Sequence, residues 1–283
     1  MSILITADEL AALDAPRVLD VRWRLDRPDG SAEHRAGHVP GAVYVDLDDE
    51  LAQHGEPSDG RHPLPTVESL QASARGWGID DDSTVVVYDD QGNLAAGRAW
   101  WLLTYAGVAD VRVLDGGLQA WTAAGRELAT GDENPPSGTV TLSYGHLPVI
   151  TADDALDVAA EGSLLDARAP ERFLGETEPI DPVAGHVPGA LNTPTGGNLD
   201  ADGRFLPAEQ LRRRFLDAGV DPEAPVATYC GSGVTAAHNV IALTLAGFEP
   251  ALYPGSWSQW SNQPHRPVET GPTQSAPSEG ASA

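Results

Sequence analysis

The only cysteine of the chain, Cys230, stands where a nucleophile could work. It follows the apolar run 225–229, which predicts a buried strand, and it precedes a glycine-rich loop and the helical stretch 236–246. Such a loop aims successive backbone N–H groups at one point, and these donors favour the reactive thiolate. We therefore predict that Cys230 is a nucleophile. We also predict that an anionic substrate or persulfide at Cys230 is bound by the loop residues that follow it: Gly231, Ser232, Gly233, Val234 and Thr235.

A lone cysteine also limits what else the chain can be. It excludes an intrachain disulfide and a cysteine-rich zinc site. A lone cysteine is by default a small buried hydrophobic residue. The predicted strand, loop and helix around Cys230 favour the nucleophile over that default.

The chain contains an internal repeat. The segment Gly37-His-Val-Pro-Gly-Ala42 recurs unchanged at 185–190, and several flanking segments recur in the same order. Asp59-Gly-Arg61, for example, has its counterpart in the segment 202–204. Two copies of one domain explain this pattern. The first copy has Asp89 where the second has Cys230, so we expect it to be catalytically silent.

Within each copy, short β-branched runs alternate with helical patterns. Residues 17–21, 83–88 and 111–114 predict strands, and residues 95–106 predict a helix. This alternation is typical of the α/β class, with a mainly parallel sheet covered by helices on both faces. We expect an N-terminal domain at 1–130, a linker at 131–149, a catalytic C-terminal domain at 150–268 and a disordered tail at 269–283. Thr6 and Thr151, each followed three residues later by an acid, predict the first helix of each copy.

Composition narrows the function classes. The formal net charge is −25, from 42 acidic and 17 basic residues, which disfavours binding to nucleic acid. The apolar runs are too short to span a bilayer, and the N-terminal residues do not resemble a signal peptide. We expect a protein of the cytoplasm that does not bind membranes.

Two other functions are open to a cysteine in this setting. Cysteine-dependent phosphatases need an arginine six residues after the cysteine to clamp the phosphate, and Ala236 stands there. A phosphatase is therefore disfavoured. A non-catalytic binding module is the remaining alternative, and the intact Cys-Gly-Ser-Gly loop argues against it.

The repeated Gly-His-Val-Pro-Gly-Ala, the segment Asp115–Trp121 and the segment Gly255–Trp260 together resemble the tandem-domain rhodanese family. The loop Cys230–Thr235 is similar to that of its 3-mercaptopyruvate sulfurtransferase branch. The resemblance implies two rhodanese-like domains and transfer of sulfur from a small anionic donor, through a Cys230 persulfide, to cyanide or a thiol such as that of reduced thioredoxin. The uncharged loop favours 3-mercaptopyruvate as the donor, and thiosulfate is the alternative. The resemblance further implies that no metal and no organic cofactor is needed.

The resemblance also implies roles for single residues. Arg172 matches an arginine that binds the donor's carboxylate, whereas Asp181 replaces a second family arginine and would repel that carboxylate unless turned away. His38, Ser232 and Asp29 match a proton relay. Because His186 occupies the same motif in the other copy, a structural role for His38 stays open.

Four further residues are expected to be structural. Trp257 and Trp260 are aromatic residues suited to core packing, and Asp20 and Asp166 are each followed two residues later by an arginine with which they could pair.

Overall fold

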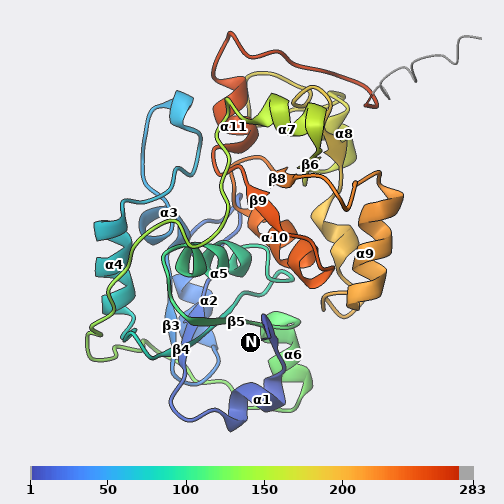
Figure 1. The fold of residues 1–283 in the computed structure, drawn as a ribbon. Coiled ribbons are helices and arrows are strands. Elements are labelled where there is room, and N and C mark those ends of the chain that lie inside the picture. The colour runs from blue at the N-terminus through green and yellow to red at the C-terminus, as the bar shows by residue number, and fades with distance from the viewer. Residues whose placement is uncertain (1, 274–283) are drawn as a thin grey trace, which may run out of the picture.

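The structure is a computed structural model that describes residues 2–273. It has two lobes, the first in blue to green and the second in yellow to red in Figure 1. The first lobe contains the strands β1 (Leu4–Ile5), β2 (Arg17–Asp20), β3 (Ala42–Tyr44), β4 (Thr84–Tyr88) and β5 (Asp110–Leu114). Its helices are α1 (Ala7–Ala12), α2 (Ser31–Ala36), α3 (Leu47–Glu50), the 3₁₀ helix η1 (Pro57–Asp59), α4 (Val67–Gly76), α5 (Ala96–Tyr105) and α6 (Gly117–Ala123).

The second lobe repeats this order on a smaller scale. Its strands are β6 (Ser163–Asp166), β7 (Leu191–Asn192), β8 (Val226–Tyr229) and β9 (Pro250–Leu252). Its helices are α7 (Ala155–Glu161), α8 (Pro170–Phe173), the 3₁₀ helix η2 (Thr195–Asn198), α9 (Ala208–Asp217), α10 (Thr235–Leu245) and α11 (Ser256–Ser261). Across residues 2–273, no helix is long and apolar enough to cross a membrane.

Both sheets are parallel. The first has the strand order β1-β5-β4-β2-β3 and the second has the order β7-β6-β8-β9. In the second lobe, a single parallel bridge between Val149 and Leu252 of β9 corresponds to the pairing of β1 with β5. The predicted α/β class with two repeated parallel sheets is confirmed. Since all strands of a sheet run the same way, β4 and β8 end at the edges where ligands bind in such folds.

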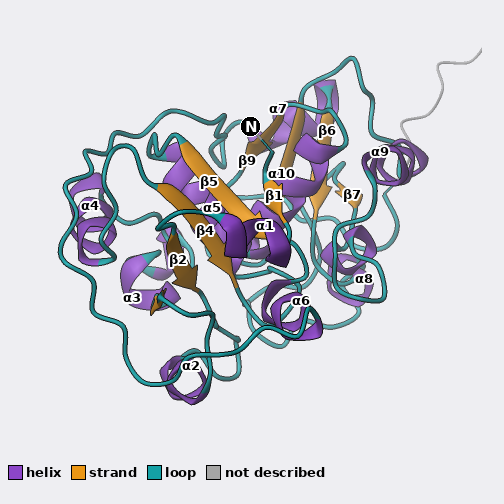
Figure 2. Ribbon diagram, turned by 90° about the horizontal axis from the view of Figure 1, so that it is seen from below, coloured by secondary structure: helices purple, strands orange, loops and turns teal. Residues whose placement is uncertain are grey.

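The strand β4 shows how helices cover both faces of the first sheet (Figure 2). Val85 and Val87 pack into the core formed with α4 and α5, whereas Val86 and Tyr88 pack into the core formed with α1 and α6. This alternation follows from the two-residue period of a strand. A strand buried on both faces must be apolar throughout, which explains the run of three valines.

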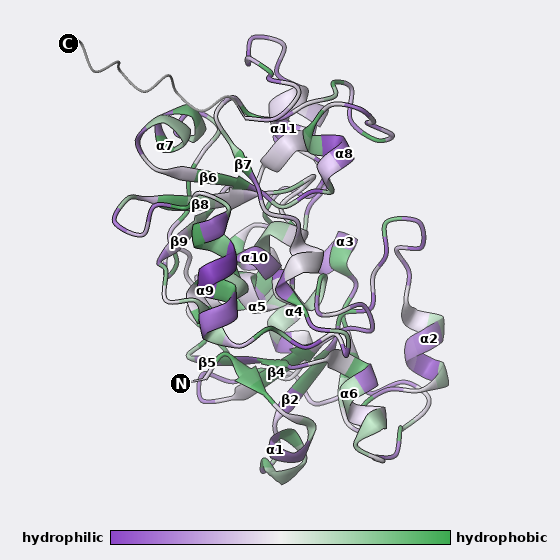
Figure 3. Cartoon of the chain, turned by 90° about the vertical axis from the view of Figure 1, so that its right-hand side faces the viewer, coloured by the Kyte–Doolittle hydropathy of each residue, from purple (hydrophilic) through white to green (hydrophobic). Residues whose placement is uncertain are grey.

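The helices α5 and α10 join the two lobes. They lie side by side in the centre of Figure 1, and one apolar cluster extends from β4 through both helices to β8. A Cβ atom at Gly97 of α5 would lie only 3.0 Å from the backbone N of His238 in α10, so glycine permits this close approach. In Figure 3 the strands β4 and β5 are green, and the outlying helix α9 is largely purple. The shared apolar core holds the lobes in one arrangement.

The predicted strands and helices are confirmed to within one residue at each end, both in the first copy and around Cys230. Thr6 caps α1 with a reciprocal bond to Glu9, as predicted. The predicted helix start at Thr151 was wrong by three residues. The Asp154 side chain accepts hydrogen bonds from the backbone and hydroxyl of Thr151, which closes a turn, and α7 begins only at Ala155.

The predicted disordered tail, 269–283, falls mostly outside the described residues, which end at 273. For residues 269–273 the prediction of disorder was wrong. Glu269 forms an antiparallel bridge with His186, and the Gly271 N–H donates to the carbonyl of Leu174. Backbone hydrogen bonds to the second lobe therefore hold this segment without a large apolar side chain.

Asp20 and Asp166 have the structural role expected of them. Each ends a strand, and each accepts bidentate hydrogen bonds from the arginine two residues later, Arg22 or Arg168. Both pairs are buried, so each charge is balanced where water is excluded. Trp257 and Trp260, fully buried, pack in the core of the second lobe, as predicted.

Candidate active site

The loop that carries Cys230 connects the end of β8 to the start of α10. Cys230 is 2% exposed, and the Gly233 N–H donates to its Sγ at 3.1 Å. The Cys230 N–H donates to Ser256 Oγ at 3.1 Å, and its carbonyl accepts from the Trp257 N–H at 3.0 Å. Contacts with the segment that starts α11 therefore fix the backbone on both sides of the thiol.

Gly233 has a backbone conformation that the site requires. Its φ is +79°, and a Cβ atom there would lie 2.2 Å from the carbonyl oxygen of Pro254. A side chain is therefore excluded both by the left-handed backbone and by the lack of space. This turn is what aims the Gly233 N–H at Cys230.

The corresponding loop of the first copy shows what such a loop binds. The carboxylate of Asp89, at the position of Cys230, accepts from the backbone N–H groups of four residues at 2.7–3.1 Å: Gln91, Asn93, Ala95 and Ala96. Burial raises the pKa of Asp89, and the four N–H groups oppose that effect by favouring the carboxylate. In the first lobe the protein's own anion fills the cradle, and no sulfur nucleophile is present.

In the second lobe the thiol opens on a cavity of about 260 Å³. The predicted site residues Arg172, Gly231, Ser232, Val234 and Thr235 all line it. Three residues of the first lobe, Trp23, Leu25 and Arg61, line the same cavity. The site therefore lies between the lobes.

A hydrogen-bonded chain of three side chains leads away from the loop. His62 Nδ1 lies 2.7 Å from Ser232 Oγ, and its Nε2 lies 3.2 Å from Asp48 Oδ1. Trp23 Nε1 donates to the same Asp48 oxygen at 3.0 Å. Because a carboxylate only accepts, the neutral ring carries its proton on Nε2, and Nδ1 accepts from the Ser232 hydroxyl. The arrangement can move a proton to or from the cavity.

Burial sets the protonation of this chain. His62 is 6% exposed, and burial lowers the pKa of the imidazole, while the hydrogen bond and charge of Asp48 oppose that shift. The hydrogen bond from His62 lowers the pKa of Asp48 in turn, against the effect of its own burial. At neutral pH the ring is neutral and Asp48 is ionised, which suits a proton relay.

The predicted relay through His38 and Asp29 is not formed. His38 is fully buried, its Nδ1 lies 2.8 Å from the carbonyl oxygen of His34, and its ring stacks on the His34 ring at 4.0 Å. Asp29 is exposed and accepts from the Ser31 N–H. Neither residue lines the cavity around Cys230. Ser232 instead forms a hydrogen-bonded chain with His62 and Asp48.

The repeated motif explains why the prediction for His38 was wrong. His186 of the second copy stacks on Phe173 and bonds the Phe173 carbonyl, as His38 does with His34. Arg22 and Arg168 donate to the carbonyl of the glycine before each motif histidine. The motif is a structural turn in both copies. His62 follows the repeated Asp-Gly-Arg but has Phe205 as its counterpart, and this difference between copies is the signal that could have identified it.

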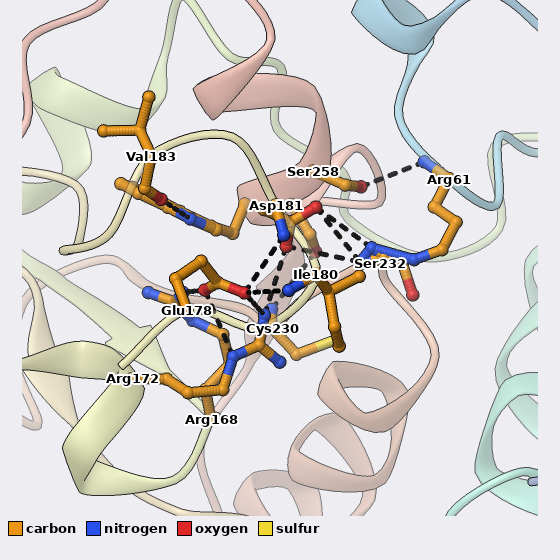
Figure 4. Close-up of polar contacts among 12 residues, drawn as sticks. Arg61, Arg168, Arg172, Glu178, Ile180, Asp181, Val183, Cys230, Ser232 and Ser258 are labelled. Carbon is orange, nitrogen blue, oxygen red and sulfur yellow. Dashed lines mark hydrogen bonds and ion pairs between the residues drawn. The ribbon is translucent and has the colours of Figure 1, made fainter. Parts of the chain in front are cut away.

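Two arginines face the loop from opposite lobes (Figure 4). A Cβ atom at Gly231 would lie 3.5 Å from Arg172 Nη1 and 3.9 Å from Arg61 Nη2. Arg172, a predicted site residue, comes from α8, whereas Arg61 comes from the first lobe and was not among the predicted site residues. Asp181 is not turned away from the site, because it pairs with both arginines. Cations at this position can bind an anionic donor beside the thiol.

The sequence matches a known protein family and several known proteins along most of its length. The rhodanese-like domain family matches residues 6–124 and 151–263. The chain is 51% identical to a Mycobacterium tuberculosis protein provisionally named thiosulfate sulfurtransferase SseB, over 95% of this chain and 97% of that one. It is 46% identical to a Pseudomonas aeruginosa protein provisionally named 3-mercaptopyruvate sulfurtransferase, over 95% and 98% of the two chains.

A solved structure shares the whole fold. The crystal structure of SseA from Escherichia coli, described as a 3-mercaptopyruvate sulfotransferase with a rhodanese fold, matches with a TM-score of 0.80 and 33% identity, over 91% of this chain and 99% of that one. The two matched segments, the two repeated sheets and the cysteine loop of the second lobe lead to one conclusion. The chain belongs to the rhodanese family of sulfurtransferases, with two rhodanese-like domains in tandem.

Proposed function

We propose that the protein moves a sulfane sulfur from 3-mercaptopyruvate to a thiol or cyanide through a persulfide on Cys230. One observation carries the proposal: the Cys230 thiol opens on a cavity lined by Arg61 and Arg172 and by Ser232, which is hydrogen-bonded to His62. Sulfur transfer from 3-mercaptopyruvate requires three kinds of group: cations that bind its carboxylate, a nucleophile that attacks its sulfur, and a group that carries a proton.

In the first step the Cys230 thiolate attacks the donor sulfur. An S–S bond forms, and the C–S bond breaks with its electron pair going to carbon, which leaves the enolate of pyruvate. The proton that converts the enolate into pyruvate comes from the thiol of the donor. The Ser232 hydroxyl can relay it, because the unprotonated Nδ1 of His62 can accept a proton from that hydroxyl and then return it. The Gly233 N–H, 3.1 Å from Sγ, can stabilise the negative sulfur.

In the second step the outer sulfur passes to the acceptor, and Cys230 is restored as a thiolate. Cyanide gives thiocyanate, and a thiolate gives a persulfide or, with a dithiol such as reduced thioredoxin, a disulfide and hydrogen sulfide. The cycle needs the thiol to be reduced, which suits the cytoplasm, where thiols are kept reduced.

Thiosulfate is a second candidate donor. Arg61 adds a cation beside Gly231 that the uncharged loop itself lacks, and two cations suit the sulfonate group. With thiosulfate, the donor's S–S bond breaks and sulfite leaves, so no carbon has to be protonated. The name of the Mycobacterium tuberculosis relative refers to this donor.

The two domains have different tasks in this proposal. The domain at 150–268 supplies the nucleophile, and the domain at 1–130 is silent, since Asp89 fills its own loop. The silent domain still supplies Arg61 to the lining of the cavity, and it supplies His62 and Asp48 to the hydrogen-bonded chain that starts at Ser232. The segment 131–149 connects them.

Steady-state kinetics with each donor, using cyanide as the acceptor, test the proposal. We expect turnover with 3-mercaptopyruvate, loss of that turnover in Cys230→Ser, and a mass increase of one sulfur atom on Cys230 when donor is given without acceptor. His62→Ala separates the donors, since it slows the donor that needs proton transfer to carbon more than it slows thiosulfate. If the wild-type protein, with its thiol free, uses neither donor, the proposed function is wrong and the non-catalytic binding module is supported.

A further inference from the structure

Two arginines that line the cavity, Arg61 and Arg172, pair with the carboxylates Glu178 and Asp181, and we call these four side chains the mouth cluster (Figure 4). Asp181 Oδ1 accepts from both terminal nitrogens of Arg61 at 3.0 and 3.1 Å. Its Oδ2 accepts from Arg172 Nη2 at 3.1 Å. One carboxylate therefore bridges the two arginines, as the carboxylate of a bound donor would.

Glu178 completes the cluster. It accepts from Arg172 Nε at 3.1 Å and from Arg172 Nη2 at 2.7 Å. Its Oε1 also accepts from the backbone N–H groups of Ile180 and Asp181, both at 3.1 Å. Glu178 thereby shapes the loop so that Asp181 points inward, and the side chain of Asp181 is only 4% exposed.

The charges of the mouth cluster cancel. Two guanidinium groups face two carboxylates, and the nearby Arg168, which also contacts Glu178, is balanced by its bidentate partner Asp166. An anion that reaches Cys230 therefore meets no net positive charge, in a protein whose net charge is −25. Burial raises the pKa of Asp181, as does the adjacent Glu178, whereas Arg61 and Arg172 oppose that shift.

We propose that Asp181 limits the affinity of the site for anionic sulfur donors, because it competes with the anionic head group of the donor for Arg61 and Arg172. This inference rests on the proposed function for the nature of the donor. A small anionic donor binds only when Asp181 leaves the arginines, so its affinity is low. Asp181 touches no reacting atom, so the chemical step is unchanged once the donor is bound.

The proposal predicts which kinetic constant changes. In Asp181→Asn the amide keeps the shape of the side chain and removes its charge. We expect the KM for 3-mercaptopyruvate and for thiosulfate to fall about tenfold, with kcat within about twofold of the wild type. Asp181→Glu, which keeps the charge, should retain the KM of the wild type. The matched control is Asp202→Asn, which removes one exposed charge far from the mouth cluster in sequence.

A second measurement does not depend on turnover. Iodoacetate and iodoacetamide alkylate a thiol in the same way, but only the first is an anion. We expect Asp181→Asn to increase the ratio of the iodoacetate rate to the iodoacetamide rate at Cys230 about tenfold, with no change in Asp202→Asn. Asp181→Ser serves as a second charge-removing variant if the amide disturbs the loop, and thermal unfolding checks that each variant is folded.

The outcomes separate the two proposals. An unchanged alkylation ratio in both charge-removing variants, or a higher donor KM, would overturn the role of Asp181. If the wild type uses neither donor while Asp181→Asn still increases the iodoacetate ratio, then the proposed donors are wrong and the role of Asp181 in excluding anions is supported.

Discussion

The hydroxyl of Ser232 and the imidazole of His62 are 2.7 Å apart, although 170 positions of sequence separate them. Ser232 belongs to the loop that carries Cys230, and His62 belongs to the silent domain. Docking of the two lobes therefore assembles the hydrogen-bonded chain that we propose as a proton relay. Although the first copy has Asp89 at the position of Cys230, residues of both copies contribute to the site.

Removal of the imidazole should slow the chemistry and leave the thiol intact. In His62→Ala we expect kcat with 3-mercaptopyruvate to fall about 10²–10³-fold, because general acid–base catalysis contributes on that order. Alkylation of Cys230 by iodoacetamide should stay within a few-fold of the wild type. The control is His54→Ala, since the His54 side chain is 87% exposed. Equal losses in both variants would contradict the relay.

The pH profile should report the same residue. Because burial lowers the pKa of His62, activity should be retained below pH 6.5 and lost only in more acid solution. Asp48 opposes this shift, so Asp48→Asn should move the acid limb of the kcat profile to still lower pH. A limb that moves upward in Asp48→Asn would contradict this assignment.

His38 should matter for stability and not for turnover. It is fully buried between the His34 ring and the repeated turn. We expect His38→Ala to lower the free energy of unfolding by about 2–3 kcal/mol, through a cavity and the lost hydrogen bond to the His34 carbonyl. Urea unfolding measures the loss. Turnover of the folded fraction should remain within a few-fold of the wild type, and a hundredfold loss would restore His38 as a relay residue.

Arg98 of α5 should fix the position of the active loop. It is fully buried and donates to the carbonyl oxygens of Leu51, His62 and Gly233, the last at 3.3 Å across the domain interface. Burial lowers the pKa of Arg98 to about 10, which still leaves it charged at neutral pH. Arg98→Met would leave three carbonyl groups without this donor, and each unpaired buried group costs about 1–3 kcal/mol.

We therefore expect Arg98→Met to lower the free energy of unfolding by at least about 2 kcal/mol and to reduce kcat/KM of the folded protein about tenfold or more. Urea unfolding and donor kinetics check both effects. Arg213→Met, on the exposed side of α9, is the matched control and should change neither. Normal kinetics in folded Arg98→Met would limit Arg98 to a role in stability.

His238 should make the fold sensitive to acid. Burial lowers its pKa to about 3, and the charge of Arg214 acts in the same direction, whereas a hydrogen bond with the Gly92 backbone opposes it. The unfolded state takes up this proton near pH 6.5. Between pH 6.5 and pH 3 the unfolded state therefore binds one more proton at this site than the folded state, and stability falls as the pH falls.

The contribution is about 1.4 kcal/mol per pH unit, or about 2 kcal/mol at pH 5. In His238→Gln, which cannot take up that proton, the free energy of unfolding should decline less steeply between pH 7 and pH 5. Urea unfolding at several pH values measures the slope. An unchanged slope would mean that other groups, such as His62 and His186, whose pKa values burial also lowers, account for the acid sensitivity.

The amino-acid sequence alone determined the repeat and the strands and helices of each copy. It also identified Cys230 as the candidate nucleophile. These features are local or periodic. The apolar run before Cys230, the glycines after it and the contrast with Asp89 all lie within a few residues of the site. Strand and helix bounds follow from the same short-range preferences of the chain.

Only the tertiary structure decided which residues meet Cys230 across the interface. The Gly-His-Val-Pro-Gly-Ala repeat drew attention to His38, yet contacts between the lobes bring His62 and Arg61 to the loop. The pairing of Asp181 with Arg61 likewise joins two lobes. Short-range patterns do not encode such contacts, because they depend on how two separately folded sheets dock through a shared apolar core.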